Sequence, residues 1–198
     1  MKALANAVLA LAVLTGCCAY ADPDVTLTLI PITGTVEGAP GDTVGWGFTI
    51  TNNSAFDLLL NQSAFCGPGG DIMFNDCSTP YNGVNQFGPS LGTYTDYIAL
   101  QSIEIAPGGS AMQNFDSTAM TGTGAYMIDA APSGSVDLGN IFLVYDEYMG
   151  NPFMGGTFVD ETESFATAEV IVAPEPSTFG LAAGCLLAFA ALRRRLSR

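Results

Sequence analysis

Residues 40–52 read Pro-Gly-Asp-Thr-Val-Gly-Trp-Gly-Phe-Thr-Ile-Thr-Asn, and they indicate the fold class more clearly than any other part of the chain. The Pro-Gly-Asp triplet is typical of a tight turn, because proline presets its backbone angle and glycine accepts left-handed angles. After the turn, every second residue from Val44 to Ile50 is apolar. This period of two predicts a β-strand with one face in a hydrophobic core.

The same alternation recurs on both sides of this strand, and turn residues such as Asn52-Asn53-Ser54, Ser133-Gly134 and Gly155-Gly156 separate the segments. No segment between the two ends of the chain has a helical period of useful length. The clearest further strands are predicted at 25–29, 55–65, 94–100, 103–105, 141–146 and 165–172. Short strands at this density predict an all-β fold, an immunoglobulin-like β-sandwich covering residues 22–172. Residues 40–52 also resemble the turn-strand-turn unit of bacterial surface immunoglobulin-like repeats.

The distribution of charge is unusual. The chain has five basic residues, nineteen acidic residues and no histidine, for a formal net charge of −14. The basic residues all lie near the ends of the chain, at Lys2, Arg193, Arg194, Arg195 and Arg198. Since Glu175 is the one acid outside the predicted domain, that domain carries eighteen carboxylates and no cation. This composition excludes the Lys and Arg contacts through which proteins bind nucleic acids.

The C-terminal residues have three successive parts. Pro174-Glu175-Pro176-Ser177-Thr178 is held extended by its two prolines, an uncharged apolar run follows from 179 to 192, and Arg193-Arg194-Arg195 comes next. The apolar run predicts a short transmembrane helix of about 21 Å at 1.5 Å per residue. The arginines predict that the tail faces the cytoplasm and that everything before it is exported.

This order of parts resembles the PEP-CTERM sorting signal of Gram-negative bacteria, here at residues 173–198. The resemblance implies that exosortase, a membrane cysteine protease-transpeptidase, recognises Pro174-Glu175-Pro176 and processes the tail. It also implies a link to exopolysaccharide and biofilm. A single-pass tail anchor after a proline-rich linker is the alternative interpretation of the same residues.

The N-terminal residues 1–21 predict a secretory signal peptide, with Lys2 before an apolar run and a cleavage motif at Ala19-Tyr20-Ala21. Signal peptidase and the Sec translocon are therefore expected partners, and Asp22 is the expected first residue of the exported protein. Leu14-Thr15-Gly16-Cys17 also resembles a lipoprotein signal, in which Cys17 would be acylated.

Cys66 and Cys77 lie in the predicted exported domain, where an oxidising compartment favours a disulfide. Such a bond would close a loop rich in glycine and aspartate. The spacing of the two cysteines does not resemble a metal site, and the chain has no histidine to complete one.

Catalytic chemistry has little basis in these residues, because the predicted domain lacks the His and Lys side chains that most general bases require. We therefore expect a non-enzymatic protein of the cell envelope or extracellular matrix, passing through the inner membrane before processing, without a cofactor or assigned metal ligands. One alternative is a carbohydrate-binding module or adhesin that uses exposed rings such as Tyr81, Tyr94 or Tyr148.

A second alternative is a glycoside hydrolase with a carboxylate pair drawn from Asp146-Glu147 or Asp160-Glu161-Thr162-Glu163. Calcium is a minority hypothesis, since it binds oxygen ligands of the kind that Asp71, Asn75 and Asp76, or Asp146 and Glu147, provide.

Overall fold

The computed structural model describes residues 24–70, 77 and 88–174, and it contains ten β-strands arranged in two five-stranded sheets. Two three-residue 3₁₀ helices complete the regular structure of these residues. The all-β class predicted from the alternating pattern is therefore confirmed.

The first sheet has the strand order β1-β3-β8-β5, and β7 pairs with the free half of β3. Its strands are β1 (Val25–Ile30), β3 (Thr43–Asn52), β8 (Gly124–Ile128), β5 (Gly92–Asp96) and β7 (Ser110–Gln113). All of its pairings are antiparallel.

The second sheet has the order β2-β10-β9-β4-β6. Its strands are β2 (Thr35–Gly38), β10 (Thr157–Val172), β9 (Val136–Met149), β4 (Asp57–Cys66) and β6 (Ile103–Ile105). Only β2 and β10 run parallel, and they join the first part of the described chain to its last strand. A cis peptide between Ile30 and Pro31 lies where the chain passes from the first sheet to the second.

The strand predicted around residues 43–51 lies at the centre of the first sheet. Trp46, Phe48 and Ile50 are completely buried, as the period of two predicts. The Trp46 indole donates a hydrogen bond to the Gly34 carbonyl at 2.6 Å. This bond satisfies the one polar atom of a ring that is otherwise surrounded by apolar groups.

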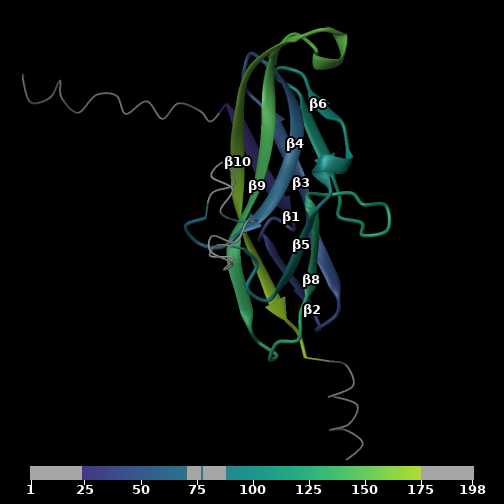
Figure 1. The fold of residues 1–198 in the computed structure, drawn as a ribbon, viewed down its shortest axis with the longest axis vertical. Coiled ribbons are helices and arrows are strands. Elements are labelled where there is room, and N and C mark those ends of the chain that lie inside the picture. Colours follow the sequence, from purple (N-terminus) through teal and green to yellow (C-terminus); the bar gives the residue numbers. More distant parts are fainter. Residues whose placement is uncertain (1–23, 71–76, 78–87, 175–198) are drawn as a thin grey trace, which may run out of the picture.

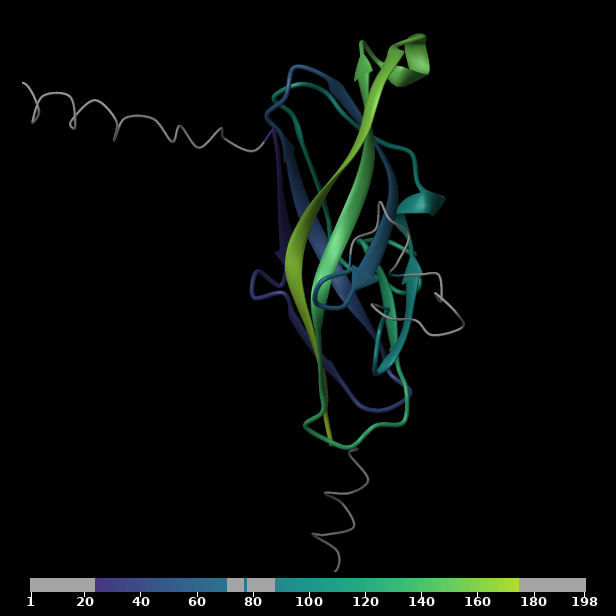
Figure 2. The ribbon, with the colours of Figure 1, turned by 60° about the vertical axis from the view of Figure 1, so that its left-hand side comes forward.

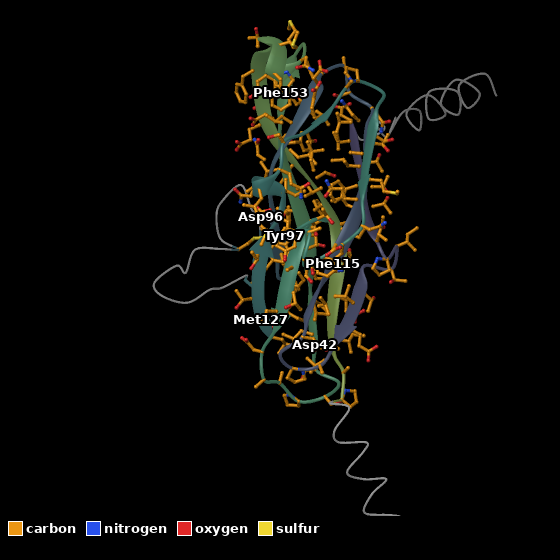
Figure 3. The ribbon with its side chains drawn as sticks, turned by 90° about the vertical axis from the view of Figure 1, so that its right-hand side faces the viewer. Asp42, Asp96, Tyr97, Phe115, Met127 and Phe153 are labelled. Atoms are coloured by element: carbon orange, nitrogen blue, oxygen red, sulfur yellow. A yellow bond between two sulfur atoms is a disulfide. The ribbon has the colours of Figure 1, made fainter. Side chains whose placement is uncertain are left out.

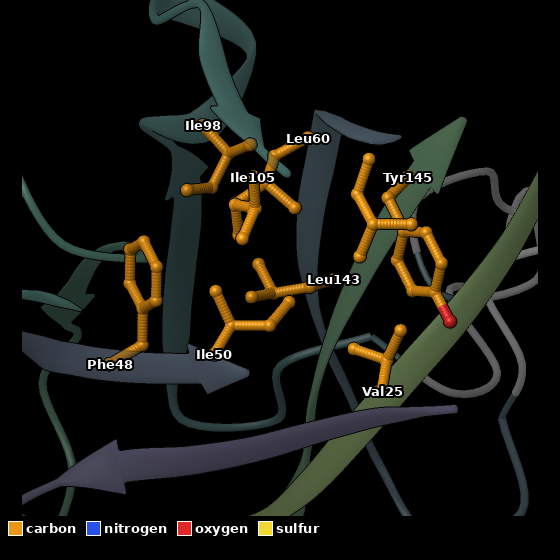
Figure 4. Close-up of a cluster of buried hydrophobic side chains, with 9 residues drawn as sticks. Val25, Phe48, Ile50, Leu60, Ile98, Ile105, Leu143 and Tyr145 are labelled. Carbon is orange, nitrogen blue, oxygen red and sulfur yellow. The ribbon is translucent and has the colours of Figure 1, made fainter. Parts of the chain in front are cut away.

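Two large clusters of buried side chains lie between the sheets. In the cluster shown in Figure 4, Phe48 and Ile50 of β3 meet Leu143 and Tyr145 of β9. The other cluster joins Trp46 to residues of β4, β8, β9 and β10. Because both clusters take side chains from both sheets, the sheets pack face to face. Both clusters lie within residues 25–172, so this region contains the core that it needs to fold.

The β9–β10 hairpin is much longer than the other strand pairs. Its register runs from Thr157↔Met149 to Ile171↔Val136, with a bulge between Phe158 and Asp160. Figures 1 and 2 show its closed end extending beyond the rest of the body, opposite the end where the chain leaves β10.

The predicted bounds of three strands are wrong, and the strand expected at 141–146 spans Val136–Met149 in the structure. The alternation at 94–100 does not continue as a strand, because the Asp96 carboxylate accepts the backbone N–H groups of Ile98 and Ala99 at 2.8 and 3.3 Å. These bonds start the 3₁₀ helix Ile98–Leu100 instead. The last strand begins at Thr157 rather than at Phe165, since its exposed polar half is held by pairing with β9.

Several sequence predictions fall outside the described residues. They are the signal peptide with Ala19 and Ala21, the acylated Cys17, and the transmembrane helix with its arginines. Within residues 24–70, 77 and 88–174, no helix has the length and apolar character needed to cross a membrane.

Candidate functional site

The first candidate site is the junction between the folded body and the C-terminal motif. Val172 is the last residue of β10. Its N–H donates to the Ser135 carbonyl at 2.9 Å, and its own carbonyl accepts from the Gly134 N–H at 2.7 Å. Ala173 donates to the Gly38 carbonyl at 2.7 Å. Pro174 follows directly and is exposed. Among the described residues, the last backbone hydrogen bond is that of Ala173, so the Pro-Glu-Pro motif begins at the next residue without a spacer.

The remaining predicted sorting residues, 175–178 and 193–195, lie outside the described part of the chain. What the structure contributes is the place from which they extend. In Figure 1 the chain leaves the body at the end occupied by β2 and the last residues of β10. The opposite end is formed by the β9–β10 hairpin.

The second candidate site is a pocket of about 420 Å³ between β4 and β5. It forms because β6 pairs only with Leu58–Leu60, which leaves the following half of β4 without that neighbour. The strand opposite, β5, is the last strand of the first sheet. The described residues that line the pocket are Gln62, Ser63, Ala64, Phe65, Cys77, Pro89, Gly92, Thr93, Tyr94 and Asp96.

A chain of hydrogen bonds joins the polar groups of this pocket. The Tyr94 hydroxyl donates to Ser63 Oγ at 3.1 Å. The Ser63 hydroxyl lies 2.6 Å from Asp96 Oδ1 and 2.5 Å from the Thr123 carbonyl oxygen, and these two acceptors share its single proton. Burial raises the pKa of Tyr94 above its ordinary value, so this hydroxyl keeps its proton. Figure 3 shows Asp96 midway along the body, on the side that faces the viewer.

The polar groups of this pocket are placed to form hydrogen bonds with a ligand. Ser63 is buried and hydrogen-bonded to a carboxylate, but the exported region has no histidine or lysine to act as its base. The Asp96 carboxylate also accepts the backbone N–H of Ile98 at the start of the 3₁₀ helix, so Asp96 has a structural role as well. The groups of the pocket can donate and accept hydrogen bonds to a neutral polar ligand.

The disulfide predicted between Cys66 and Cys77 is present beside this pocket. Both cysteines are buried, and they form a small cluster with Ala64, Phe142 and Val144 on the outer face of the second sheet. Phe165 packs on Phe142 with its ring centroid 5.2 Å away and is itself exposed.

Asp137 is a buried carboxylate that the sequence pattern does not single out. It accepts hydrogen bonds from the Ser90 backbone N–H at 2.8 Å, from the Ser90 hydroxyl at 2.7 Å and from the Leu91 N–H at 3.2 Å. The Tyr126 hydroxyl is a fourth donor. A buried carboxylate with four donors satisfies the rule that buried charge must be hydrogen-bonded, and here it ties residues 90–91 to the core.

The predicted acidic clusters lie opposite each other near the closed end of the β9–β10 hairpin. In the β9–β10 register, Glu147 lies opposite Asp160 and Asp146 lies opposite Glu161. Partial burial, followed by the charges of Asp24 and Asp160, raises the pKa of Glu147. No group of three or more Asp, Glu, Cys or His side chains among the described residues is arranged to hold a metal ion. Asp71, Asn75 and Asp76 lie outside those residues.

The candidate tyrosines do not form one aromatic surface in the described structure. Tyr94 belongs to β5 and lies in the pocket, whereas Tyr148 belongs to β9 and packs edge-on against Phe158 at 5.9 Å. Tyr81 lies outside the described residues.

Comparison with known protein families identifies the motif at the first candidate site, the junction at the end of β10. The model of the PEP-CTERM protein-sorting motif matches residues 172–195, and this signal implies an exported, envelope-associated protein that is sorted by exosortase. The order of proline pair, apolar run and arginines predicted this motif, and the prediction is confirmed. The match begins at Val172, the last residue of β10. No curated protein matches the sequence at a significant level.

Proposed function

We propose that the exported body is a non-enzymatic component of the cell envelope or extracellular matrix, associated with exopolysaccharide. The observation that carries this proposal is the sorting motif, which continues directly from the last strand of a folded body. The uniformly acidic composition is compatible with a hydrated matrix, because it favours solubility and lacks cations that would collapse onto anionic polymers.

The proposed route has three stages. Signal peptidase and the Sec translocon handle residues 1–21, the segment after Pro176 holds the protein in the inner membrane, and exosortase then acts at Pro174-Glu175-Pro176. Because the motif has no spacer, the folded body meets exosortase close to the membrane surface.

We further propose that the fold is immunoglobulin-like. Three features support this: the first strand is divided between the sheets as β1 and β2, β2 runs parallel to the last strand, and the order β10-β9-β4 follows. This matches the side-by-side placement of strands G, F and C in immunoglobulin domains. The chain departs from the antibody pattern in its disulfide, which joins Cys66 to Cys77 instead of linking the two sheets.

Carbohydrate binding in the β4–β5 pocket is the second candidate function. The pocket has the volume of a small-ligand site and combines Tyr94 and Phe65 with the polar groups of Gln62, Ser63 and Asp96. Asp96 is the one carboxylate in its described lining. Since glycoside hydrolysis requires two carboxyl groups, the pocket favours sugar binding over the hydrolase alternative.

Extraction of the matrix tests the main proposal. Cells that make exopolysaccharide and isogenic cells that do not are compared for the share of the protein retained after salt washing. We expect retention only in the polysaccharide-producing cells, and equal retention in both would contradict the proposal.

A glycan-binding assay tests the second candidate separately. Gln62→Ala and Thr93→Val change the pocket lining without touching the hydrogen bonds of Ser63, whereas Met112→Ala changes an exposed residue elsewhere. Binding that is lost in the first two variants and kept in the third supports the pocket as a sugar site.

A further inference from the structure

The closed end of the β9–β10 hairpin, residues 149–159, is an exposed apolar tip. It contains no charged residue. Five of its large apolar side chains are exposed, with Met154 at 86 %, and they are Met149, Phe153, Met154, Phe158 and Val159. A group of exposed apolar side chains on a protein that is otherwise strongly acidic marks an interaction site.

This tip has an ordered backbone. The Asn151 carbonyl accepts the N–H groups of Met154 and Gly156 at 3.0 and 2.9 Å, and the Asn151 side chain accepts the Phe153 N–H at 2.9 Å. Gly150 and Gly155 adopt left-handed angles, with φ of +81° and +89°, which other residues adopt only with strain. The apolar side chains are therefore presented on a preformed turn, so binding orders little chain.

Acidic residues surround the base of the tip. Asp146, Glu147, Asp160 and Glu161 lie opposite one another on the two strands just below it, and we call these four residues the acidic collar. At about 3.4 Å per strand residue, the turn reaches roughly 10 Å beyond the collar. Figure 3 shows Phe153 at one end of the body, and Figure 1 shows that the chain leaves β10 at the other end.

The chemistry of the tip discriminates between possible occupants. A second copy of the chain would bring two acidic collars together, and five side chains offer less than the roughly 1,200 Å² that stable protein interfaces bury. A sugar requires convergent polar groups, but the Asn151 amide is already bonded to Phe153 and Glu104. A lipid surface requires only apolar side chains at the height of the headgroups.

We propose that the tip inserts into an uncharged lipid surface, such as one of zwitterionic phospholipids. Its reach of roughly 10 Å matches the 5–10 Å to which apolar faces penetrate the interface. The acidic collar, and the carboxylate of Glu104 that accepts from the Asn151 amide, then remain in water at the headgroup level and disfavour anionic lipids. Because the sorting motif extends from the opposite end, the tip faces away from the membrane in which the tail is processed.

Vesicle flotation of residues 22–174 tests the proposal, because this region contains both core clusters and lacks the apolar tail. Vesicles of phosphatidylcholine should bind the wild type, and the double variant Phe153→Ser/Met154→Ser should bind about tenfold more weakly. Ile32→Ser/Leu100→Ser is the matched control, since it removes two residues that are 85 % and 65 % exposed outside the tip. Thermal unfolding of each variant checks that the fold is kept.

Fluorescence provides a second, local measurement. Trp46 is the only tryptophan and is completely buried, so Phe153→Trp adds a reporter at the tip. Its emission should shift to the blue with phosphatidylcholine vesicles and less with phosphatidylglycerol vesicles, whereas Leu100→Trp should not shift. No shift at Phe153→Trp, equal loss of flotation in the control, or tip-dependent dimers without vesicle binding would each overturn the proposal.

Discussion

At the scale of single residues, the polar side chains of Asn52, Ser63, Thr123 and Asp137 are buried and have specific hydrogen-bond partners, whereas the exposed acids have no cation to pair with in the described region. Asp137 and Ser63 show this most clearly. Each lies on a strand of the second sheet and bonds to residues in or beside strands of the first sheet, so each helps to hold the two sheets together. The acids at the surface contribute mainly repulsion.

Removing the Asp137 carboxylate should destabilise the protein strongly. Asp137→Ala leaves the Tyr126 hydroxyl and the two donors of Ser90 without their acceptor, at a cost of about 2–3 kcal/mol in the free energy of unfolding. The Leu91 N–H keeps the Tyr126 hydroxyl as an acceptor at 3.2 Å. Urea unfolding measures this. Glu37→Gln, an exposed acid on β2, is the control and should change stability by less than about 0.5 kcal/mol.

Glu147→Gln should stabilise the protein near neutral pH. The raised pKa of Glu147 means that its ionised form is less favoured in the folded state than in the unfolded state. Its contribution to stability is therefore lost as pH rises from 4.5, the ordinary value, through the raised value.

Melting temperatures across this pH range provide the measurement. The melting temperature of the variant should exceed that of the wild type near neutral pH, and the two should converge below pH 4.5, where Glu147 is protonated in both states. A constant difference at all pH values would show that the charge is not responsible.

At the scale of elements, alternation predicted the strands well where one face is buried, as at β3 and β1. It could not locate β2, because Thr35–Gly38 is short and its partner β10 lies far away in sequence. The end of β5 depends on one side chain, Asp96, which competes with strand pairing. The pocket depends on where β6 stops pairing with β4, which no local pattern encodes.

The junction of β10 and the sorting motif leads to a prediction about processing. A flexible Gly-Ser linker inserted between Ala173 and Pro174 should speed exosortase processing severalfold, because it lets an extended motif enter the enzyme without contact with the folded body.

Pulse-labelling of cells that express exosortase measures the rate. The same linker inserted after Ala119, in an exposed turn of a different part of the body, should leave the rate unchanged. If both insertions act alike, the missing spacer does not control processing.

At the scale of the whole molecule, the alternating pattern predicted the all-β class, and the motif predicted the sorting class, from local information alone. The placement of the apolar tip and of the last residues of β10 at opposite ends could not be predicted, because it follows from the length and pairing of β9 and β10. The acidic character affects the molecule as a whole, since eighteen carboxylates lie in the exported region without a cation.

Added salt should therefore raise the melting temperature. The carboxylates are closer together in the folded state than in the expanded chain, and screening shortens their repulsion to about 10 Å at 0.1 M salt. Thermal unfolding in low salt, in NaCl and in CaCl₂ of matched ionic strength measures the effect. An unchanged melting temperature in NaCl would contradict the repulsion, and a larger rise in CaCl₂ would indicate specific calcium binding.

Intact mass of the exported protein tests the central claim most directly, which is that both ends are sorting signals around one folded body. In cells with exosortase, the account predicts a species that begins at Asp22 and lacks Arg193–Arg198. The matched strain without exosortase should yield a species that keeps these arginines. An exported protein that retains its arginines in both strains would contradict the account.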